Sequence, residues 1–94
     1  MTKHILKREI IGIKLLCDDA LFLLKFADKV NSRWYRIIAL HHGHTKLGKI
    51  KFKDMVNIIK PIRTNKPLTP RYIRMLYYLG LYQIKEIINN EARL

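Results

Sequence analysis

The residues best suited to do chemistry are arginines and lysines that occupy a long interval without acids. Between Asp54 and Glu86 the sequence contains no acidic residue, and six basic residues fall inside that interval: Lys60, Arg63, Lys66, Arg71, Arg74 and Lys85. A solvated helix surface normally mixes both signs of charge, so this interval is typical of a face that binds an anion. The whole chain carries 19 Lys and Arg against 7 Asp and Glu, a net charge of +12. This surplus favours a polyanionic partner, with nucleic acid before an anionic membrane surface.

Other kinds of chemistry find little support in the residue types and their spacing. The sequence has no glycine-rich phosphate loop, no Ser-His-Asp pattern and no acid at a spacing from a histidine that would indicate a catalytic pair. A zinc site is raised as an alternative by four residues: His41, His42, His44 and Cys17. A closed zinc site needs four ligands, however, and adjacent histidines on a helix point in different directions. We therefore expect a protein that is not an enzyme and needs no metal or cofactor, with Cys17 as an inert buried thiol.

Length and hydrophobic pattern set the size of the fold and its compartment. With 94 residues, 49% of them hydrophobic, the chain predicts one folded domain and not a disordered basic tail. A single cysteine allows no internal disulfide, which fits a reducing compartment. Lys14 and Lys25 interrupt the most apolar region, so no stretch approaches the roughly 18 apolar residues of a membrane span. We expect a cytoplasmic protein without a membrane partner.

The elements that must position the basic residues are predicted to be mainly helical. The expected helices cover residues 4–16, 19–29, 32–42, 52–60 and 70–79. Polar residues stand where three of them should begin: Asp18 or Asp19, Asn31 or Ser32, and Thr69 followed by Pro70. Gly43, Pro61 and Gly80 stand where three should end. Gly12 and the neighbouring isoleucines leave a strand as the alternative for residues 4–16.

The segment after Gly80 is predicted to be a β-hairpin. Residues 81–88 alternate and are β-prone, and Asn89-Asn90 suits a tight turn that returns through residues 91–94. Residues 50–52 form either a short strand or the direct lead into the next helix. On the helix of residues 70–79, the core-facing side chains are expected to be Ile73, Leu76 and Leu79. The other face collects residues at i, i+3, i+4 and i+7 spacing: Arg71, Arg74, Met75 and Tyr78.

Helices over residues 32–42, 52–60 and 69–79, followed by Leu79-Gly80-Leu81 leading into a hairpin, resemble a winged helix-turn-helix. The resemblance covers residues 32–94, although the connector of residues 61–68 is longer than the tight turn of a simple helix-turn-helix. The implied fold class is mainly α with a small β-hairpin. Residues 31–94 would form the winged helix-turn-helix, and residues 1–30 an N-terminal helical dimerisation extension. Within this family the chain is similar to PadR-like regulators and to small winged-helix proteins of archaeal plasmids and viruses, including AspA-type components of partition systems.

This resemblance implies two sets of DNA contacts. A recognition helix enters the major groove with its N-terminal residues at the base edges, which here are Thr69, Arg71, Tyr72, Arg74 and Tyr78. Arginine in this position can donate two hydrogen bonds to guanine O6 and N7. A second set would bind phosphates without reading sequence: Lys51, Lys53, Lys60, Arg63 and Lys66. Lys85 and Arg93, on the wing, would reach the minor groove or the backbone.

The apolar N-terminal segment predicts self-association. A winged helix of residues 32–94 already has a core, so the large apolar side chains before it need another surface to cover them. A two-fold partner is the simplest such surface. The expected interface residues are Ile13, Leu16, Leu21, Leu24 and Phe26. A homodimer would present two recognition helices about one turn of DNA apart and would therefore bind a palindrome.

The implied function is sequence-specific binding of double-stranded DNA by a homodimer associated with a nucleoid or plasmid. The process would be plasmid or chromosome partition, through centromere binding, or transcription regulation. A partition role would add a ParB-like adaptor protein as a partner. The alternative from another class is an RNA-binding or ribosome-associated basic protein, which basic charge and tyrosines would serve equally well.

Overall fold

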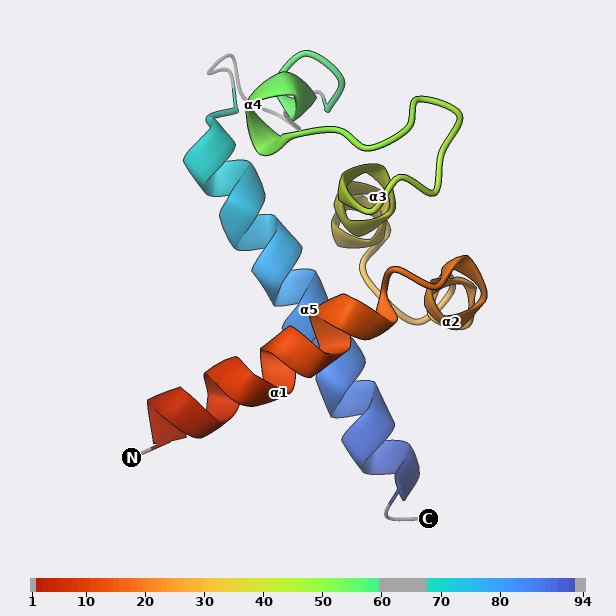
Figure 1. Ribbon diagram of the computed structural model, residues 1–94, viewed down its shortest axis with the longest axis vertical. Coiled ribbons are helices and arrows are strands. Elements are labelled where there is room, and N and C mark those ends of the chain that lie inside the picture. The colour runs from red at the N-terminus through yellow and green to blue at the C-terminus, as the bar shows by residue number, and fades with distance from the viewer. Residues whose placement is uncertain (1, 60–67, 93–94) are drawn as a thin grey trace.

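The fold is built around one long helix, α5, on which three shorter helices pack. The computed structural model describes residues 2–59 and 68–92, with side chains from residue 9 onward. The helices are α1 (Thr2–Leu16), α2 (Ala20–Leu24), α3 (Ser32–His41), α4 (Phe52–Met55) and α5 (Pro70–Ala92). α1, α3 and α4 all contact α5. Figure 1 shows α1 crossing the middle of α5, while α4 lies beside the N-terminal end of α5.

The predicted helix starts are confirmed, because each starting residue caps the backbone as its side chain allows. Asp19 Oδ1 accepts a hydrogen bond from the Leu21 N–H at 2.9 Å. Asn31 Oδ1 accepts from the Arg33 N–H at 3.0 Å. Thr69 Oγ1 accepts from the N–H of Tyr72 at 3.1 Å, with Pro70 in the first helical position. These local signals are readable from sequence because a cap and the N–H groups it satisfies lie within three residues.

Gly43 ends α3 as predicted. Its φ angle of 79° is left-handed, a conformation that glycine adopts without a steric penalty. The N–H of His44 then donates to the carbonyl oxygen of Ala39 at 2.9 Å, and the Gly43 N–H donates to that of Leu40 at 3.3 Å. This pair of bonds satisfies the last carbonyls of the helix and turns the chain back along it.

The predicted winged helix-turn-helix with a β-hairpin is wrong. The described residues 2–59 and 68–92 contain no strand, and α5 continues without a break through Gly80, residues 81–88 and Asn89-Asn90. Gly80 is buried where α5 packs on α3, and a Cβ there would lie 2.7 Å from Ile38 Cδ1 and 3.1 Å from Trp34 Cβ. The glycine therefore permits two helices to approach closely and does not end a helix.

Two other helices are shorter than predicted. α2 covers only Ala20–Leu24, and turns continue the chain to Lys29. α4 covers only Phe52–Met55 and is followed by turns up to Ile59, while the predicted end at Lys60 and Pro61 lies outside the described residues. Residues 4–16 are helical, as favoured, and residues 50–52 lead directly into α4.

The core draws side chains from the whole length of the described chain. Its largest fully buried members come from α2, α3, α4 and α5: Leu23, Ile37, Ile38, Leu40, Met55, Ile73, Tyr77, Leu81 and Ile84. The N-terminal segment adds Ile10, Ile13 and Cys17 from α1 and its end to the same cluster. Within the described part of the chain, no helix has the length and apolarity needed to cross a membrane.

Candidate nucleic-acid interface

The first turns of α5 present the predicted base-reading residues to solvent. Arg71, Tyr72 and Arg74 are exposed, and Thr69 caps the helix beside them. The Arg74 guanidinium lies 5.9 Å from the centre of the half-buried Tyr78 ring, which orients the cation along the helix surface. Ile73 and Leu76 are buried as predicted, whereas Leu79 is exposed because the buried stripe of α5 continues through Tyr77, Gly80, Leu81 and Ile84 instead.

A chain of aromatic rings fixes α4 against this part of α5. The Tyr78 ring lies 5.2 Å from Tyr77, and Tyr77 lies 5.2 Å from Phe52 at the start of α4. Phe52 in turn stacks on the His41 ring at 4.3 Å, with the planes 7° apart. Lys51 and Lys53 flank Phe52 and are both exposed. The ring contacts therefore hold two predicted phosphate-binding lysines close to the N-terminal half of α5.

The cations of this region have no described acidic partner. Among the described residues, no carboxylate lies within ion-pair distance of Arg71, Arg74, Lys51 or Lys53. We refer to these four residues as the basic end of the molecule. The other predicted contacts at Lys60, Arg63, Lys66 and Arg93 lie outside the described residues.

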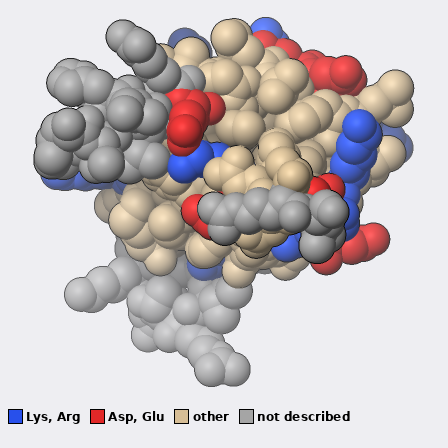
Figure 2. All heavy atoms as spheres, turned by 90° about the horizontal axis from the view of Figure 1, so that it is seen from below, with Lys and Arg blue, Asp and Glu red and all other residues tan. Residues whose placement is uncertain are grey.

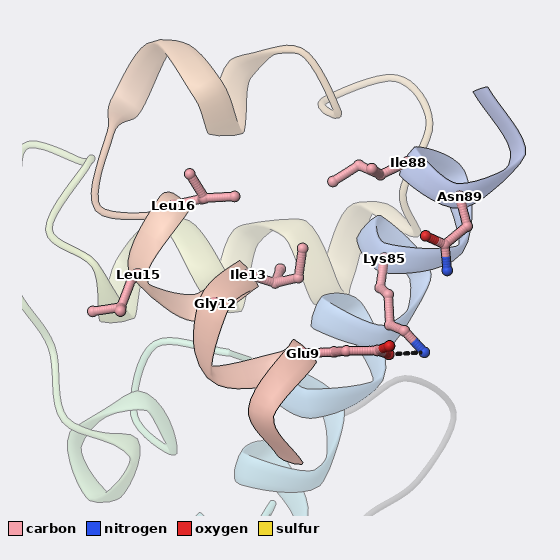
Figure 3. Close-up of a pocket in the computed structure, with 8 residues that line it drawn as sticks. All are labelled: Glu9, Gly12, Ile13, Leu15, Leu16, Lys85, Ile88 and Asn89. Carbon is pink, nitrogen blue, oxygen red and sulfur yellow. Dashed lines mark ion pairs between the residues drawn. The ribbon is translucent and has the colours of Figure 1, made fainter. Parts of the chain in front are cut away.

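Lys85 is placed quite differently from these four cations. It lies on the C-terminal half of α5, where its Nζ is 2.6 Å from Glu9 Oε2 of α1 and its side chain is only 14% exposed. The hydrogen bond to Glu9 raises the pKa of Lys85. Figure 3 shows this ion pair at one end of a groove of about 610 Å³ between α1 and α5, with Ile13, Leu16 and Ile88 beside it. Because the wing does not exist, Lys85 is an interhelical contact and not a wing residue.

Behind the basic end, a hydrogen-bonded network joins three segments of the chain. His42 Nδ1 lies 2.7 Å from Asp18 Oδ1, and His42 Nε2 lies 2.6 Å from the Tyr77 hydroxyl. The hydrogen bond from His42 lowers the pKa of Asp18, so the carboxylate is ionised and accepts from Nδ1–H. Burial lowers the pKa of His42 and raises that of Tyr77. Nε2 of the neutral imidazole therefore accepts a hydrogen bond from the Tyr77 hydroxyl, and each buried polar atom of the network is satisfied.

His41 and His44 also contact backbone carbonyl oxygens. His44 Nε2 lies 2.6 Å from the carbonyl oxygen of Cys17, and His41 Nδ1 lies 3.4 Å from that of Ile50. Burial raises the pKa of the Cys17 thiol to about 12, which keeps it protonated and unreactive. In the described part of the chain, no group of three or more His, Cys, Asp or Glu residues is placed to hold a metal ion.

The predicted dimer residues divide into two groups. Ile13 and Phe26 are buried in the core of the chain itself. Leu16, Leu21 and Leu24 are exposed, Leu21 by 73% and Leu24 by 60% of the residue surface. Ile11 and Leu15 of α1 are also more than half exposed, which sequence reasoning did not single out. We refer to these five residues of α1 and α2 as the exposed apolar residues; Leu15 and Leu16 point to different sides of α1 (Figure 3).

The surface at the C-terminal end of α5 is largely uncharged and carries both acidic and basic side chains. Figure 2 shows the molecule from below relative to Figure 1, and uncharged side chains cover most of the described surface in that view. Acidic and basic side chains both lie among them.

Comparisons with protein-family models, with curated proteins and with solved structures found no match for this chain.

Proposed function

We propose that this protein binds double-stranded DNA through the basic end. The observation that carries the proposal is the exposure of Arg71, Arg74, Lys51 and Lys53 without a described acidic partner, in a chain with a net charge of +12. Exposed cations without partners are the groups that exchange counterions for phosphates, which supplies most of the affinity of non-specific binding. By contrast, the described lysines Lys29 and Lys85 already have carboxylate partners.

The shape of the basic end also suits a duplex. The N-terminal half of α5 extends beyond its crossing with α1 (Figure 1), and its first turns expose Arg71, Tyr72 and Arg74. The major groove admits one α-helix, and arginine can read guanine edges there. Lys51 and Lys53 then lie beside the helix, where phosphate contacts would set its register. This mode of binding needs a helix and flanking cations but no wing.

The exposed apolar residues of α1 and α2 support a homodimer as the DNA-binding form. Leu21 and Leu24 of α2 are among the most exposed of them, and covering such side chains favours association. A two-fold pair would bury these side chains and would present two copies of α5 to a palindrome. Such a dimer would serve centromere binding in plasmid or chromosome partition, or transcription regulation.

We expect L21E/L24E to lower the sedimentation coefficient of a dimer to that of a monomer, and an unchanged coefficient would refute this interface.

Competition binding tests the choice of nucleic acid. Labelled duplex DNA is bound at physiological salt and displaced by unlabelled duplex DNA, double-stranded RNA or heparin. We expect duplex DNA to displace the probe at a concentration at least tenfold below that of the other two polyanions. The exposed Tyr72 and Tyr82 rings keep RNA as the second candidate, because exposed aromatic rings can stack on unpaired bases. Stronger displacement by RNA would favour that function over DNA binding.

A further inference from the structure

We propose that a pocket between α1, the end of α3 and residues 49–51 binds a phosphate group of a nucleotide or nucleic acid. This inference rests on the nucleic-acid binding proposed above and names a site for it. The pocket has a volume of about 330 Å³, and three lysines line it: Lys14, Lys49 and Lys51. Asp18, His41 and His42 lie on its walls. None of the three lysines lies in the acid-free interval between Asp54 and Glu86, and only the fold brings Lys14 to Lys49 and Lys51.

The backbone holds two of these lysines in fixed positions. After Gly43 turns the chain, a second left-handed residue, Gly48 with a φ of 76°, returns it to the end of α3. The Ile50 N–H donates to the carbonyl oxygen of Leu40 at 3.0 Å, and the Ile50 carbonyl oxygen lies 3.4 Å from His41 Nδ1. Lys49 and Lys51 flank this doubly bonded residue. Their backbone is therefore fixed before any ligand arrives, which reduces the entropic cost of binding.

The packing of Gly43 brings Lys49 closer still. A Cβ at position 43 would lie 2.7 Å from Lys49 Cγ, so the aliphatic stem of this lysine rests directly on the glycine. Lys14 approaches from the last turn of α1, and Asp18 lies two residues beyond the end of that helix. Burial lowers the pKa of His41 and His42, and the positive charge of Lys14 lowers both further. The hydrogen bond from His42 lowers the pKa of Asp18, and the charge of Lys49 adds to this effect.

The charges around the pocket favour an anion. Three lysines and one aspartate line the pocket, and Asp18 Oδ1 already accepts a hydrogen bond from His42 Nδ1–H. With both histidines neutral, the pocket has a net charge of two positive units, which matches a phosphate monoester and exceeds the charge of one phosphodiester. Its volume is within the range of small-ligand sites, about 300–1,000 Å³, and leaves space for the sugar attached to the phosphate.

Histidine NMR tests the site directly, because two of the four histidines line it. Ring signals of His41, His42 and His44 are followed while inorganic phosphate is added at constant ionic strength with chloride. We expect the His41 and His42 signals to shift together and saturate. The His44 signal should stay in place, since this ring lies outside the pocket on the Cys17 carbonyl. Equal shifts of all three rings, or none, would overturn the proposal.

A matched pair of variants extends the test to nucleic acid. K14A/K49A removes two pocket lysines, and K25A/K46A removes the same charge from two exposed lysines outside the pocket. We expect K14A/K49A to weaken binding of a short duplex at least fivefold, and K25A/K46A less than twofold. Equal losses would refute the site. A preference for the 5′-phosphorylated duplex over the unphosphorylated one would assign the site to terminal phosphates, and equal affinity would assign it to internal ones.

The inference and the proposed function can fail separately. If wild-type protein binds no nucleic acid but phosphate still moves the His41 and His42 signals, the pocket is retained and DNA binding is refuted. If the protein binds DNA but K14A/K49A and K25A/K46A behave alike, DNA binding is retained and the pocket is refuted. Circular dichroism of each variant confirms that the helices are intact before either conclusion is drawn.

Discussion

The two halves of α5 carry basic side chains in very different surroundings. In the N-terminal half, Arg71 and Arg74 are exposed and have no described acid within ion-pair distance. In the C-terminal half, Lys85 is bonded to Glu9 of α1, and Glu91 lies 3.3 Å from Lys29 of the segment after α2. The cations of the N-terminal half are therefore available to a partner, whereas Lys85 of the C-terminal half stabilises the packing of α1 on α5.

The difference shows that an interval without acids in sequence need not be free of acids in space. Lys85 belongs to the same acid-free interval as Arg71 and Arg74, yet α1 brings Glu9 to it from 76 positions earlier in the chain. Charge counting predicts the size of the positive surplus but not which cations remain available. Among the described residues, Lys85 is paired with an acid and Arg71 and Arg74 are not, because α1 crosses α5 beside Lys85.

The largest expected effect is on stability and comes from a substitution at Gly80, where the two halves of α5 meet and α3 packs on the helix. We expect Gly80→Leu to lower the free energy of unfolding by about 3 kcal/mol, because even a Cβ there meets Ile38 and Trp34 of α3. Urea denaturation followed by circular dichroism measures this change. The matched control is Gly12→Ala on α1, where a Cβ meets nothing within 4 Å. That variant should gain roughly 0.5–1 kcal/mol from helix propensity, and a loss similar to that of Gly80→Leu would refute the packing at Gly80.

A second prediction concerns the network that anchors the N-terminal half through Tyr77. Burial lowers the pKa of His42 in the folded state, so below the ordinary histidine pKa of about 6.5 the unfolded chain takes up a proton that the folded chain resists. Stability should therefore be full above pH 6.5 and fall as the pH decreases, with a slope of at most about 1.4 kcal/mol per pH unit for this group. His42→Gln should flatten the slope between pH 6.5 and 5. An identical pH profile in both proteins would show that His42 does not titrate with folding.

The smallest expected effect concerns the ion pair of the C-terminal half. Glu9→Gln removes the charge that pairs with Lys85 but keeps a similar shape. Because the pair is partly exposed to solvent, we expect Tm to fall by less than about 4 °C. The released cation should not strengthen DNA binding by more than about twofold, since Lys85 lies away from the basic end. A large gain in affinity would place the DNA contact on the C-terminal half instead.

The parts of the fold that the sequence predicts are those set by local interactions. Asp19, Asn31 and Thr69 cap helices because their partners lie two or three residues away, and Gly43 ends α3 through bonds within a single turn. Gly80 carries the same residue type as Gly43 but a different role, which depends on Ile38 lying 42 positions earlier. A glycine between two leucines is therefore compatible with the end of a helix and equally with a close contact between two helices.

The candidate site follows the same rule. The exposure of Arg71 and Arg74 follows from helical spacing alone and was predicted. The network of Asp18, His42 and Tyr77 joins residues 24 and 35 positions apart, and no spacing rule connects them. The pocket lysines Lys14 and Lys49 were missed for the same reason, because α1 and the turn after α3 meet only in the folded chain.

The salt dependence of DNA affinity in two charge-matched variants tests the central claim most directly. R71A/R74A removes two exposed cations, and K29A/K85A removes two that are bonded to carboxylates. Both lower the net charge by two, so a purely global charge effect would act on them equally. We expect R71A/R74A to lose at least tenfold in affinity and to reduce the slope of log K against log salt by about 2, while K29A/K85A changes the slope by less than about 0.5. Equal slopes for the two variants would contradict the claim that the N-terminal half of α5 is the surface that binds DNA.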